Sequence, residues 1–576
     1  MLTKNIFSTA QAVLLGLSAT VLSPLCSVSA DACTNFLVGK KASATGSTMI
    51  SYAADSHQLY GELYYTPAAD HPVGAKRAIV DWDTQRPLGE IDEVAHTYRV
   101  VGNVNEWQVT VAESTWGGDL ALMDSTAVID YGSLIYIALE RSKTAREAID
   151  VMTSLVARYG YASEGETFSI GDPNEVWVMD MIAKGPANKG AVWVARRIPD
   201  DCIAAHANQA RIHRFPQSKK LNKKLNRYEV GDSCLYSADL ISFARQCGKY
   251  QGTDQDFDFA ATFGEQDYMS FRGCDGRVWA FFNHFAKGMD KYFPFVDMQC
   301  TRNCPPDSIL PLYVRPDRKL THRDVQNAMR DHFEGTPWDM SHDVGGGPFH
   351  SPYRWRPMTW KVDGKEYCHD RAVATQQTGF VFVSEMRGWL PREVGAKTWF
   401  TVDDANTAVF CPIYNNILEA PECFRVGNGD LLTFSWTSAF WMNNWVAQQV
   451  YARYEPMMVD VRRVRDALED RFDQQQDSID QEAVRLLGTS TSAVTRFLNH
   501  YSATESNAVT ARYKDLALYL LVKYMDGNVK RELPGQPGVF QRTPYGVAVS
   551  PEHPAYSDDF YRAIVQQRGD TLRVKE

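Results

Sequence analysis

The sequence predicts an α+β protein built from packed layers of strands and helices. Strand-like runs lie on both sides of an amphipathic helical segment at 143–160, and further strand-like runs return in 371–413. From about residue 433 onward, apolar residues recur at helical spacing, which predicts a helical C-terminal part. These three observations separate strand-rich from helix-rich regions along the chain, and that separation is typical of a layered α+β fold.

The first predicted strand follows Cys33. Residues 34–38 form a strand candidate that ends at Gly39, and an apolar run resumes at 47–51 after a polar turn. Two short strands around a turn predict a β-hairpin. Cys33 would stand at the start of its first strand.

The clearest predicted helix covers residues 143–160. Thr144 and Glu147 fit a capping box, and Gly160 suits the position after the last helical turn. The helix is expected to lie among further strands, at 168–171, 176–182, 192–195 and 202–205.

The middle of the chain carries weaker signals. Residues 232–247 are expected to be helical, and 300–360, rich in Pro, Gly and Trp, are expected to form a long loop or a lid. Three helices are expected towards the C-terminus, at 436–451, 459–472 and 509–525.

The N-terminal segment is predicted to be an export signal. Lys4 supplies a positive charge, residues 12–22 are mostly apolar, and Ala30 with Ala32 gives the small-residue pattern that signal peptidases prefer. Eleven residues are too few to span a bilayer as a helix, so we expect an exported, periplasmic or secreted protein without stable membrane insertion. The net charge of −10 and the lack of a long basic run argue against a nucleic-acid partner.

The chain has eleven cysteines, which could be free thiols or disulfide-bonded. Export permits disulfides, and Cys300 with Cys304, or Cys411 with Cys423, are candidate bridges. A structural zinc site needs paired Cys or His at tight spacing, and the chain has no second such pair, so we expect no metal.

Cys33 is the first candidate catalytic residue. Cleavage after Ala32 would place a thiol and a free α-amine on the same residue, a nucleophile beside its own base. The alternative is an inert, buried cysteine at a strand edge. His57 and His206 suggest a Cys–His pair, but a hydrogen-bonded structural histidine is the simpler interpretation of each.

The opening 33–43 and 46–50 resembles that of the dipeptidase A family of N-terminal-nucleophile (Ntn) cysteine peptidases, related to penicillin V acylase and bile salt hydrolase. Further matching segments follow in the family's order: 105–109, 175–179, 207–211, 277–279, 347–349 and 375–380. The resemblance implies a four-layer αββα sandwich and hydrolysis of dipeptides through an acyl-thioester on Cys33, without metal or cofactor.

The chain is expected to divide into three regions. Residues 1–32 would be a signal peptide or propeptide, and 33–430 the catalytic domain with loop insertions around 300–360. Residues 431–576 would be a mainly helical region packed on that domain, or alternatively a homo-oligomer interface.

Four more site residues are implied. Asp55 matches the acid that holds the nucleophile's amine, with a turn or cap residue as the alternative. Asn105 and Asn208 match two amides around the oxyanion, a role worth about 3–4 kcal/mol per donor, with structural hydrogen bonds as the alternative. Arg277 matches a site arginine, or is simply ion-paired. Tyr52 departs from the family, which often has Arg three residues before the Asp; it would pack or donate a hydrogen bond.

Two other functions remain open. The same machinery could act on bile-salt-like or N-acyl amides, or the chain could be a non-catalytic binding protein of the envelope. Cleavage after Ala30, in the pattern Val28-x-Ala30, would leave two residues on the amine of Cys33. The bond between Ala32 and Cys33 is therefore the one on which activity should depend.

Overall fold

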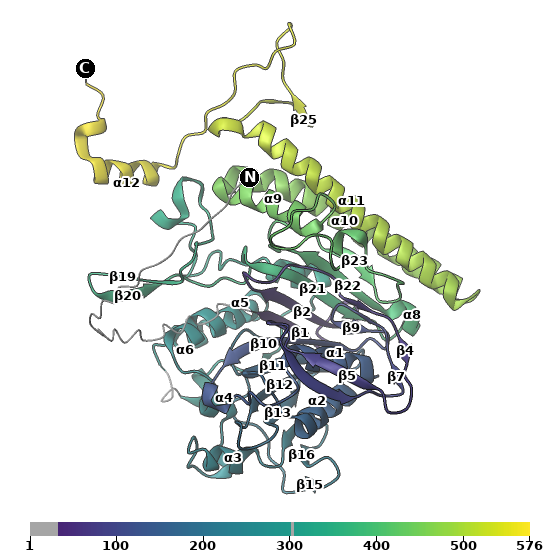
Figure 1. Ribbon diagram of the computed structural model, residues 1–576. Helices are drawn as coiled ribbons and strands as arrows, with labels where there is room; N and C mark the ends of the chain where they lie inside the picture. The colour runs from purple at the N-terminus through teal and green to yellow at the C-terminus, as the bar shows by residue number, and fades with distance from the viewer. Residues whose placement is uncertain (1–32, 301–304, 576) are drawn as a thin grey trace, which may run out of the picture. The chain divides into compact units, whose positions relative to one another are not determined.

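Two antiparallel β-sheets form the centre of the computed structural model, which describes residues 33–300 and 305–575 (Figure 1). The first sheet has the strand order β18-β14-β1-β2-β21-β22-β23. The second has the order β15-β16-β17-β13-β12-β11-β10-β9-β8-β3. Strands β1 and β2 contact β10 and β11, so the two sheets face each other there. Residues 1–32, including the predicted signal peptide, lie outside the described residues.

The strand bounds are as follows. In the first sheet they are β18 Tyr313–Val314, β14 Ile203–His206, β1 Thr34–Val38, β2 Thr48–Asp55, β21 Thr378–Met386, β22 Ala396–Val402 and β23 Cys411–Tyr414. In the second they are β15 Leu221–Asn222, β16 Arg227–Val230, β17 Cys234–Ser237, β13 Ala191–Arg197, β12 Val176–Ala183, β11 Gly165–Gly171, β10 Thr110–Gly117, β9 Val104–Asn105, β8 Val100–Val101 and β3 Tyr65–Thr66.

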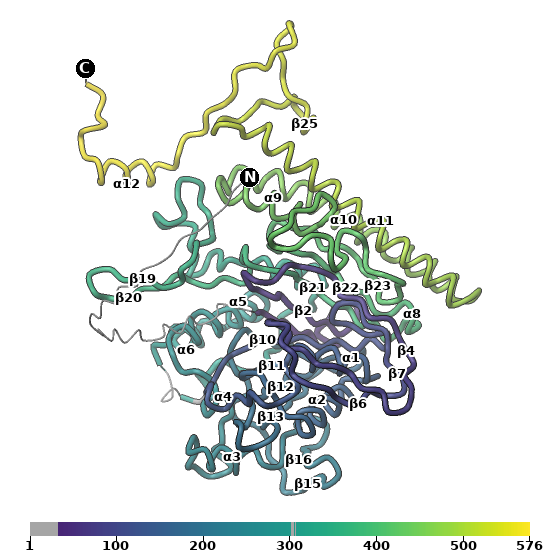
Figure 2. The backbone as a smooth tube through the Cα atoms, viewed as in Figure 1, coloured from purple at the N-terminus to yellow at the C-terminus, as the bar shows by residue number. Residues whose placement is uncertain are grey.

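The predicted hairpin is confirmed as β1 and β2, with Asn35 opposite Tyr52. Every residue of both strands is buried. The reason is that both faces of this sheet are covered: the Phe36 ring stacks on Phe281 of a helix at 3.9 Å, while the side chain of Asn35 bonds to β10. Strand β2 also pairs with β21, more than 300 residues further along the chain (Figure 2).

Helices cover the outer faces of both sheets. On the first sheet, α5 (Gly276–Phe285) contacts β14, α7 (His322–Ala328) contacts β21 and α9 (Ala439–Ala452) contacts β22. On the second, α1 (Tyr131–Arg141) contacts β10 and α2 (Ala145–Tyr159) contacts β11. The predicted α+β class is confirmed.

The predicted helix at 143–160 is confirmed as α2. The hydroxyl of Thr144 accepts a hydrogen bond from the backbone N–H of Glu147 at 3.2 Å, while the Glu147 carboxylate accepts one from Lys143 N at 2.7 Å. Gly160 ends the helix at φ 83°, a left-handed conformation that a glycine adopts without strain.

The prediction for residues 232–247 is partly wrong. Residues 234–237 form β17, and only Leu240–Gln246 form a helix, α3. Strand β17 lies between β13 and β16, so pairing with distant strands overrides the local helical pattern. The segment 300–360 is also not all loop, because it contains β18 and α7.

The helix predicted at 436–451 is confirmed as α9, and the other two predicted C-terminal helices are longer than expected. Helix α10 covers Tyr454–Leu487 and α11 covers Thr491–Lys523, and α11 packs on β23. The hairpin of β24 (Glu532–Leu533) with β25 (Gln536–Phe540) and helix α12 (Asp558–Arg568) follow (Figure 1). None of the described helices is both long and apolar enough to cross a membrane.

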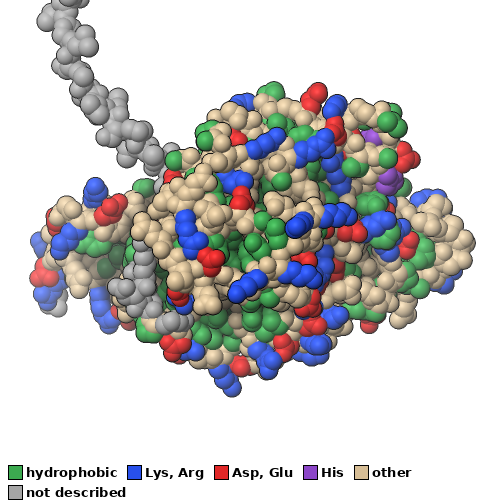
Figure 3. Space-filling model, turned by 90° about the horizontal axis from the view of Figure 1, so that it is seen from below, with side chains coloured by type: hydrophobic (Ala, Val, Ile, Leu, Met, Phe, Trp, Pro, Cys, Tyr) green, Lys and Arg blue, Asp and Glu red, His purple; other side chains and the backbone are tan. Residues whose placement is uncertain are grey.

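Charged groups of both signs are interspersed on the face drawn in Figure 3, with no basic stripe. Cys300 is disulfide-bonded. Cys411 and Cys423 are free thiols, so the second candidate bridge is not formed.

A buried acid joins α10 to the first sheet. Glu469 is 1% exposed; its carboxylate accepts hydrogen bonds from Arg330 at 2.6 Å and from the backbone N–H of Phe410 at 2.9 Å, and also binds Arg323. Burial lowers the pKa of Arg330, and the charge of Glu469 opposes that shift. This carboxylate supplies the negative charge that Arg330 needs in order to be buried.

Replacing Glu469 by glutamine is expected to destabilise the fold. The variant leaves the buried Arg330 without its counter-charge, and such a loss costs about 3–5 kcal/mol in unfolding free energy. Urea denaturation measures it, with Glu482→Gln on the exposed part of the same helix as the matched control. Equal stability of the two variants would contradict the role of Glu469.

Candidate active site

The Cys33 thiol lies between the two sheets, directly before β1. Its Sγ is 3.4 Å from Glu113 Oε1 on β10 and 3.6 Å from the hydroxyl of Tyr52 on β2. The Tyr52 hydroxyl also donates a hydrogen bond of 2.5 Å to Glu113 Oε1. Cys33 is 9% exposed and Glu113 2%, so this triangle is almost free of water.

These surroundings keep the thiol protonated. Burial raises the pKa of Cys33 well above its usual value, and the nearby charges of Glu113 and Asp55 raise it further. Hydrogen bonds from Tyr52 and from the Asp55 backbone oppose the shift. A nucleophilic attack by Cys33 therefore requires a base that takes its proton during the reaction.

Arg277 fixes the backbone at Cys33. From the first turn of α5, its guanidinium donates to the carbonyl of Cys33 at 2.8 Å, to Thr34 Oγ1 at 2.7 Å and to Asn208 Oδ1 at 2.9 Å. The side chain is buried, and burial lowers its pKa to about 10. The structure thus brings Cys33, Arg277 and Asn208 together.

Asp55 ends β2, where the pairing with β21 shifts register. Its carboxylate accepts hydrogen bonds of 2.6 Å from Arg371 and of 2.6 Å from Thr378. Burial raises the pKa of Asp55, and the charge of Arg371 and the bond from Thr378 counter that rise. Because the charge of Asp55 raises the pKa of the Cys33 thiol, this acid belongs to the same cluster as Cys33.

Asn208 follows β14 in a left-handed conformation, with φ 54°. Its amide nitrogen donates to the carbonyl of Thr115 on β10 at 2.6 Å, and its oxygen is held by Arg277. Asp180 on β12 holds the segment that follows Asn208. Its carboxylate accepts hydrogen bonds from the backbone N–H groups of Arg211 at 2.9 Å and Ile212 at 2.7 Å. Both ends of the Asn208 amide are therefore oriented.

Asn105 is a correction to the predicted site. Its two amide hydrogens bond to the carbonyls of Leu139 and Ser142, both at 2.7 Å. Its oxygen accepts from the backbone N–H groups of Trp107 and Val109, both at 2.9 Å. All its hydrogen-bonding capacity joins the β9–β10 turn to the end of α1, so none is left to stabilise an oxyanion.

Replacing Asn105 by aspartate tests this structural role. Aspartate is nearly isosteric but cannot donate to the two buried carbonyls, and leaving both without a partner costs about 2–6 kcal/mol of unfolding free energy. Chemical denaturation is the measurement, with Asn174→Asp in an exposed turn as the control. A fully stable variant that loses only turnover would restore Asn105 to the catalytic site.

Sequence reasoning missed the buried acids and one arginine. Glu113 of β10 contacts the Cys33 thiol, Glu166 lies beside it on β11, and Arg371 supplies the ion pair to Asp55. A glutamate within an otherwise apolar or hydroxylated strand is the signal that could have revealed Glu113. Tyr52, noted as a departure from the family pattern, donates its hydrogen bond to Glu113, and guanidinium groups come instead from Arg277 and Arg371.

Neither histidine contacts the thiol as a base. His206 is fully buried and its ring bonds to Ser114 at 2.6 Å and Ser169 at 2.7 Å. Burial lowers the pKa of His206 well below its usual value, so the ring is a neutral, structural link between the sheets. His57 is exposed on the loop after β2.

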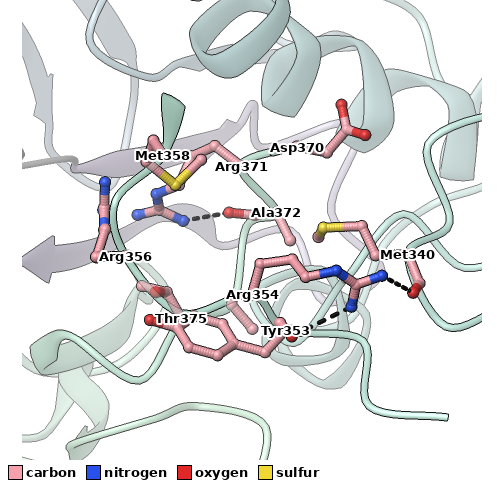
Figure 4. A pocket seen from close by; sticks show the side chains of 10 residues that line it. Met340, Tyr353, Arg354, Arg356, Met358, Asp370, Arg371, Ala372 and Thr375 are labelled. Carbon is pink, nitrogen blue, oxygen red and sulfur yellow. Dashed lines mark hydrogen bonds between the residues drawn. The ribbon is translucent and has the colours of Figure 1, made fainter. Parts of the chain in front are cut away.

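A pocket rich in arginine adjoins this cluster (Figure 4). Arg354, Arg356 and Arg371 line it, and the carboxylate of Asp370 points away from it and pairs with Arg272 at 2.6 Å. Arg371 joins the pocket to Asp55 and hence to Cys33. The pocket therefore adjoins the Asp55 carboxylate through Arg371.

A family model described as peptidase family C69 matches residues 32–467, which include every residue of this cluster. The chain belongs to peptidase family C69. Its membership assigns it to the peptidases and confirms the resemblance seen in the sequence. The matched region begins one residue before Cys33.

Curated relatives cover most of the chain at low identity. A probable dipeptidase of Latilactobacillus sakei is 23% identical over 448 residues, 74% of this chain and 82% of the relative. A probable dipeptidase of Salmonella dublin is 24% identical, covering 67% and 81% respectively. Dipeptidase A of Lactobacillus helveticus is 23% identical, covering 77% and 85%.

Proposed function

We propose that this protein is an exported cysteine dipeptidase whose nucleophile is Cys33 at the N-terminus of the mature chain. The observation that carries the proposal is the position of Cys33 at the start of β1, with its thiol between Tyr52 and Glu113 and its carbonyl on Arg277. Its family is a peptidase family, and the relatives above are named dipeptidases.

The two facing sheets with helices outside them support the four-layer αββα sandwich of the Ntn hydrolases as the fold type. In such a site the free α-amine of Cys33 takes the thiol proton as Sγ attacks the scissile carbonyl. The amine then protonates the leaving amino group, which departs as the C–N bond breaks and a thioester remains. Water attacks the thioester, and the product acid and the free thiol are released.

The remaining residues position this reaction. Arg277 binds the carbonyl of Cys33, and Asp55 lies beside its thiol. The negative charge of the Asp55 carboxylate stabilises the ammonium group that forms during attack. The oriented amide of Asn208 is the proposed donor to the oxyanion, a role worth about 3–4 kcal/mol of barrier. Removal of residues 1–32 during export would create the required amine.

The arginine-lined pocket favours a dipeptide over an N-acyl amide. Three guanidinium groups suit the free carboxylate at the end of a dipeptide, and they would be poor neighbours for an apolar acyl chain. A non-catalytic binding protein has no need of a protonated thiol held among acids and arginines at the N-terminus of the fold.

Activity is expected to require both the thiol and the cleavage before Cys33. A chain that keeps Asp31 and Ala32 has an amide in place of the basic amine, so it should not turn over dipeptides. Cys33→Ala in the mature chain should lower kcat/KM by more than about 10³-fold, because the nucleophile is lost. Intact mass of the exported protein and hydrolysis of a dipeptide panel measure the two effects.

Cys247→Ser, at a half-buried thiol that ends α3, is the matched control and should keep wild-type turnover. Undiminished hydrolysis by Cys33→Ala, or by the chain that retains residues 31–32, would refute the mechanism. If the mature protein cleaves N-acyl amides and no dipeptide, the acylase alternative is correct.

The pH profile should report the amine. The raised pKa of Cys33 keeps its thiol protonated, so the base must be neutral before attack, and kcat/KM should rise with pH up to the pKa of the α-amine, about 8 in model compounds. Below that pKa the rate should fall about tenfold per pH unit. A profile that is flat from about pH 5 to 8 would instead indicate a preformed thiolate.

A further inference from the structure

Two buried glutamates lie side by side next to the nucleophile. Glu113 on β10 and Glu166 on β11 are 2% and 0% exposed, and Glu166 is opposite Thr115, two residues along β10 from Glu113. In each carboxyl group the Oε2 atom is buried without a hydrogen-bond partner. Thr115 donates to Glu166 at 2.7 Å, and Tyr52 donates to Glu113. Two carboxylates this close cannot both be ionised, so the pair holds one proton and one negative charge.

The proton belongs on Glu166. Burial and the charge of Glu113 raise the pKa of Glu166 well above its usual value. Burial raises the pKa of Glu113 as well, but hydrogen bonds from Tyr52 and Cys33 counter that rise. Glu113 is therefore the ionised member, and its two donors, Tyr52 and Cys33, are uncharged. Within residues 33–300 and 305–575, no Lys, Arg or His forms an ion pair with either glutamate.

A buried charge without a counter-charge is costly unless a ligand supplies one. Asp55 already has Arg371, so Glu113 is the acid in contact with Cys33 that lacks a cation. The hydrogen bond from Asn35 to the carbonyl of Glu113, at 2.5 Å, ties this acid to the strand that carries the nucleophile. The site thus holds a fixed negative charge at the reacting atom.

The dimensions of a dipeptide fit that charge. Its ammonium nitrogen is two covalent bonds from the scissile carbonyl carbon, about 2.5 Å away. A sulfur poised for attack is about 3–3.5 Å from the same carbon. The carboxylate that binds the ammonium must therefore lie within a few ångströms of Sγ, and Glu113 Oε1 lies at 3.4 Å.

We propose that Glu113, kept ionised beside a protonated Glu166, binds the free α-ammonium of the substrate and so restricts the enzyme to peptides with an unblocked N-terminus. The proposal rests on the proposed dipeptidase function. Glu113 is a substrate-binding residue here, and Tyr52, Glu166 and Asn35 are positioning residues. The arginine-lined pocket adjoins Asp55 through Arg371.

The test compares two substrates that differ only in the ammonium group, alanyl-alanine and propionyl-alanine. Wild-type enzyme should prefer alanyl-alanine in kcat/KM. Glu113→Gln should lower kcat/KM for alanyl-alanine by about 10- to 150-fold, the usual worth of a hydrogen bond to a charged group. Its kcat/KM for propionyl-alanine should change by less than about threefold, so the preference collapses. Glu113→Asp keeps the charge and should keep the preference.

Glu90→Gln, at an exposed glutamate of β6 (Pro87–Asp92), is the matched control and should retain both rates. Intact mass must show that each variant begins at Cys33, so that processing is not what changes. Equal losses of both substrates in Glu113→Gln would overturn the proposal and make Glu113 a structural residue or a base. If Glu113→Gln does not fold, the wild-type enzyme alone tests the proposal. Equal turnover of alanyl-alanine and propionyl-alanine by the wild-type enzyme would also overturn it. Failure of wild-type enzyme on every dipeptide would instead refute the proposed function.

Discussion

The contact between Arg277 and the carbonyl of Cys33 is the interaction on which the site depends. In the mature chain that we propose, Cys33 has only one covalent neighbour, so the start of β1 would lack the preceding chain that otherwise holds a strand in place. Arg277 replaces that restraint, because its planar guanidinium bonds at once to Cys33, Thr34 and Asn208. Burying the arginine lowers its pKa, and the hydrogen bonds it makes repay part of that desolvation.

The charges of the cluster are arranged in opposed groups. Arg277 and Arg371 lie towards α5 and the segment before β21, whereas Glu113 and Glu166 lie on the second sheet. Asp55 is the acid that joins the positive group through its bond to Arg371. An uneven field of this kind in a dry site orients a dipolar substrate more strongly than it would in water.

Local patterns predicted the elements whose stability is local. Helix α2 could be predicted from the sequence because its cap, its apolar face and its terminal glycine all lie within one segment. The β1–β2 hairpin could be predicted because its two strands and the turn between them also lie within one segment. By contrast, β17 carries a helix-like pattern and becomes a strand only because β13 and β16 lie on either side of it.

The candidate site shows the same division. Cys33, Asp55, Asn208 and Arg277 were predicted from motifs and do come together. Asn105 matched a motif equally well, yet its four bonds are to the local turn and the end of α1, which no motif reveals. Glu113 and Arg371 were missed because their roles arise from contacts across 80 and 316 residues of chain.

The long helix α10 has a consequence for any attempt to isolate the catalytic part of the chain. The family match ends at residue 467, inside α10 and two positions before Glu469. A fragment cut at that boundary would keep Arg330 and lose the carboxylate that allows it to be buried. It would also expose β23, against which α11 packs. The homologous segment is therefore shorter than the folding unit, and an autonomous enzyme has to include the helices beyond it.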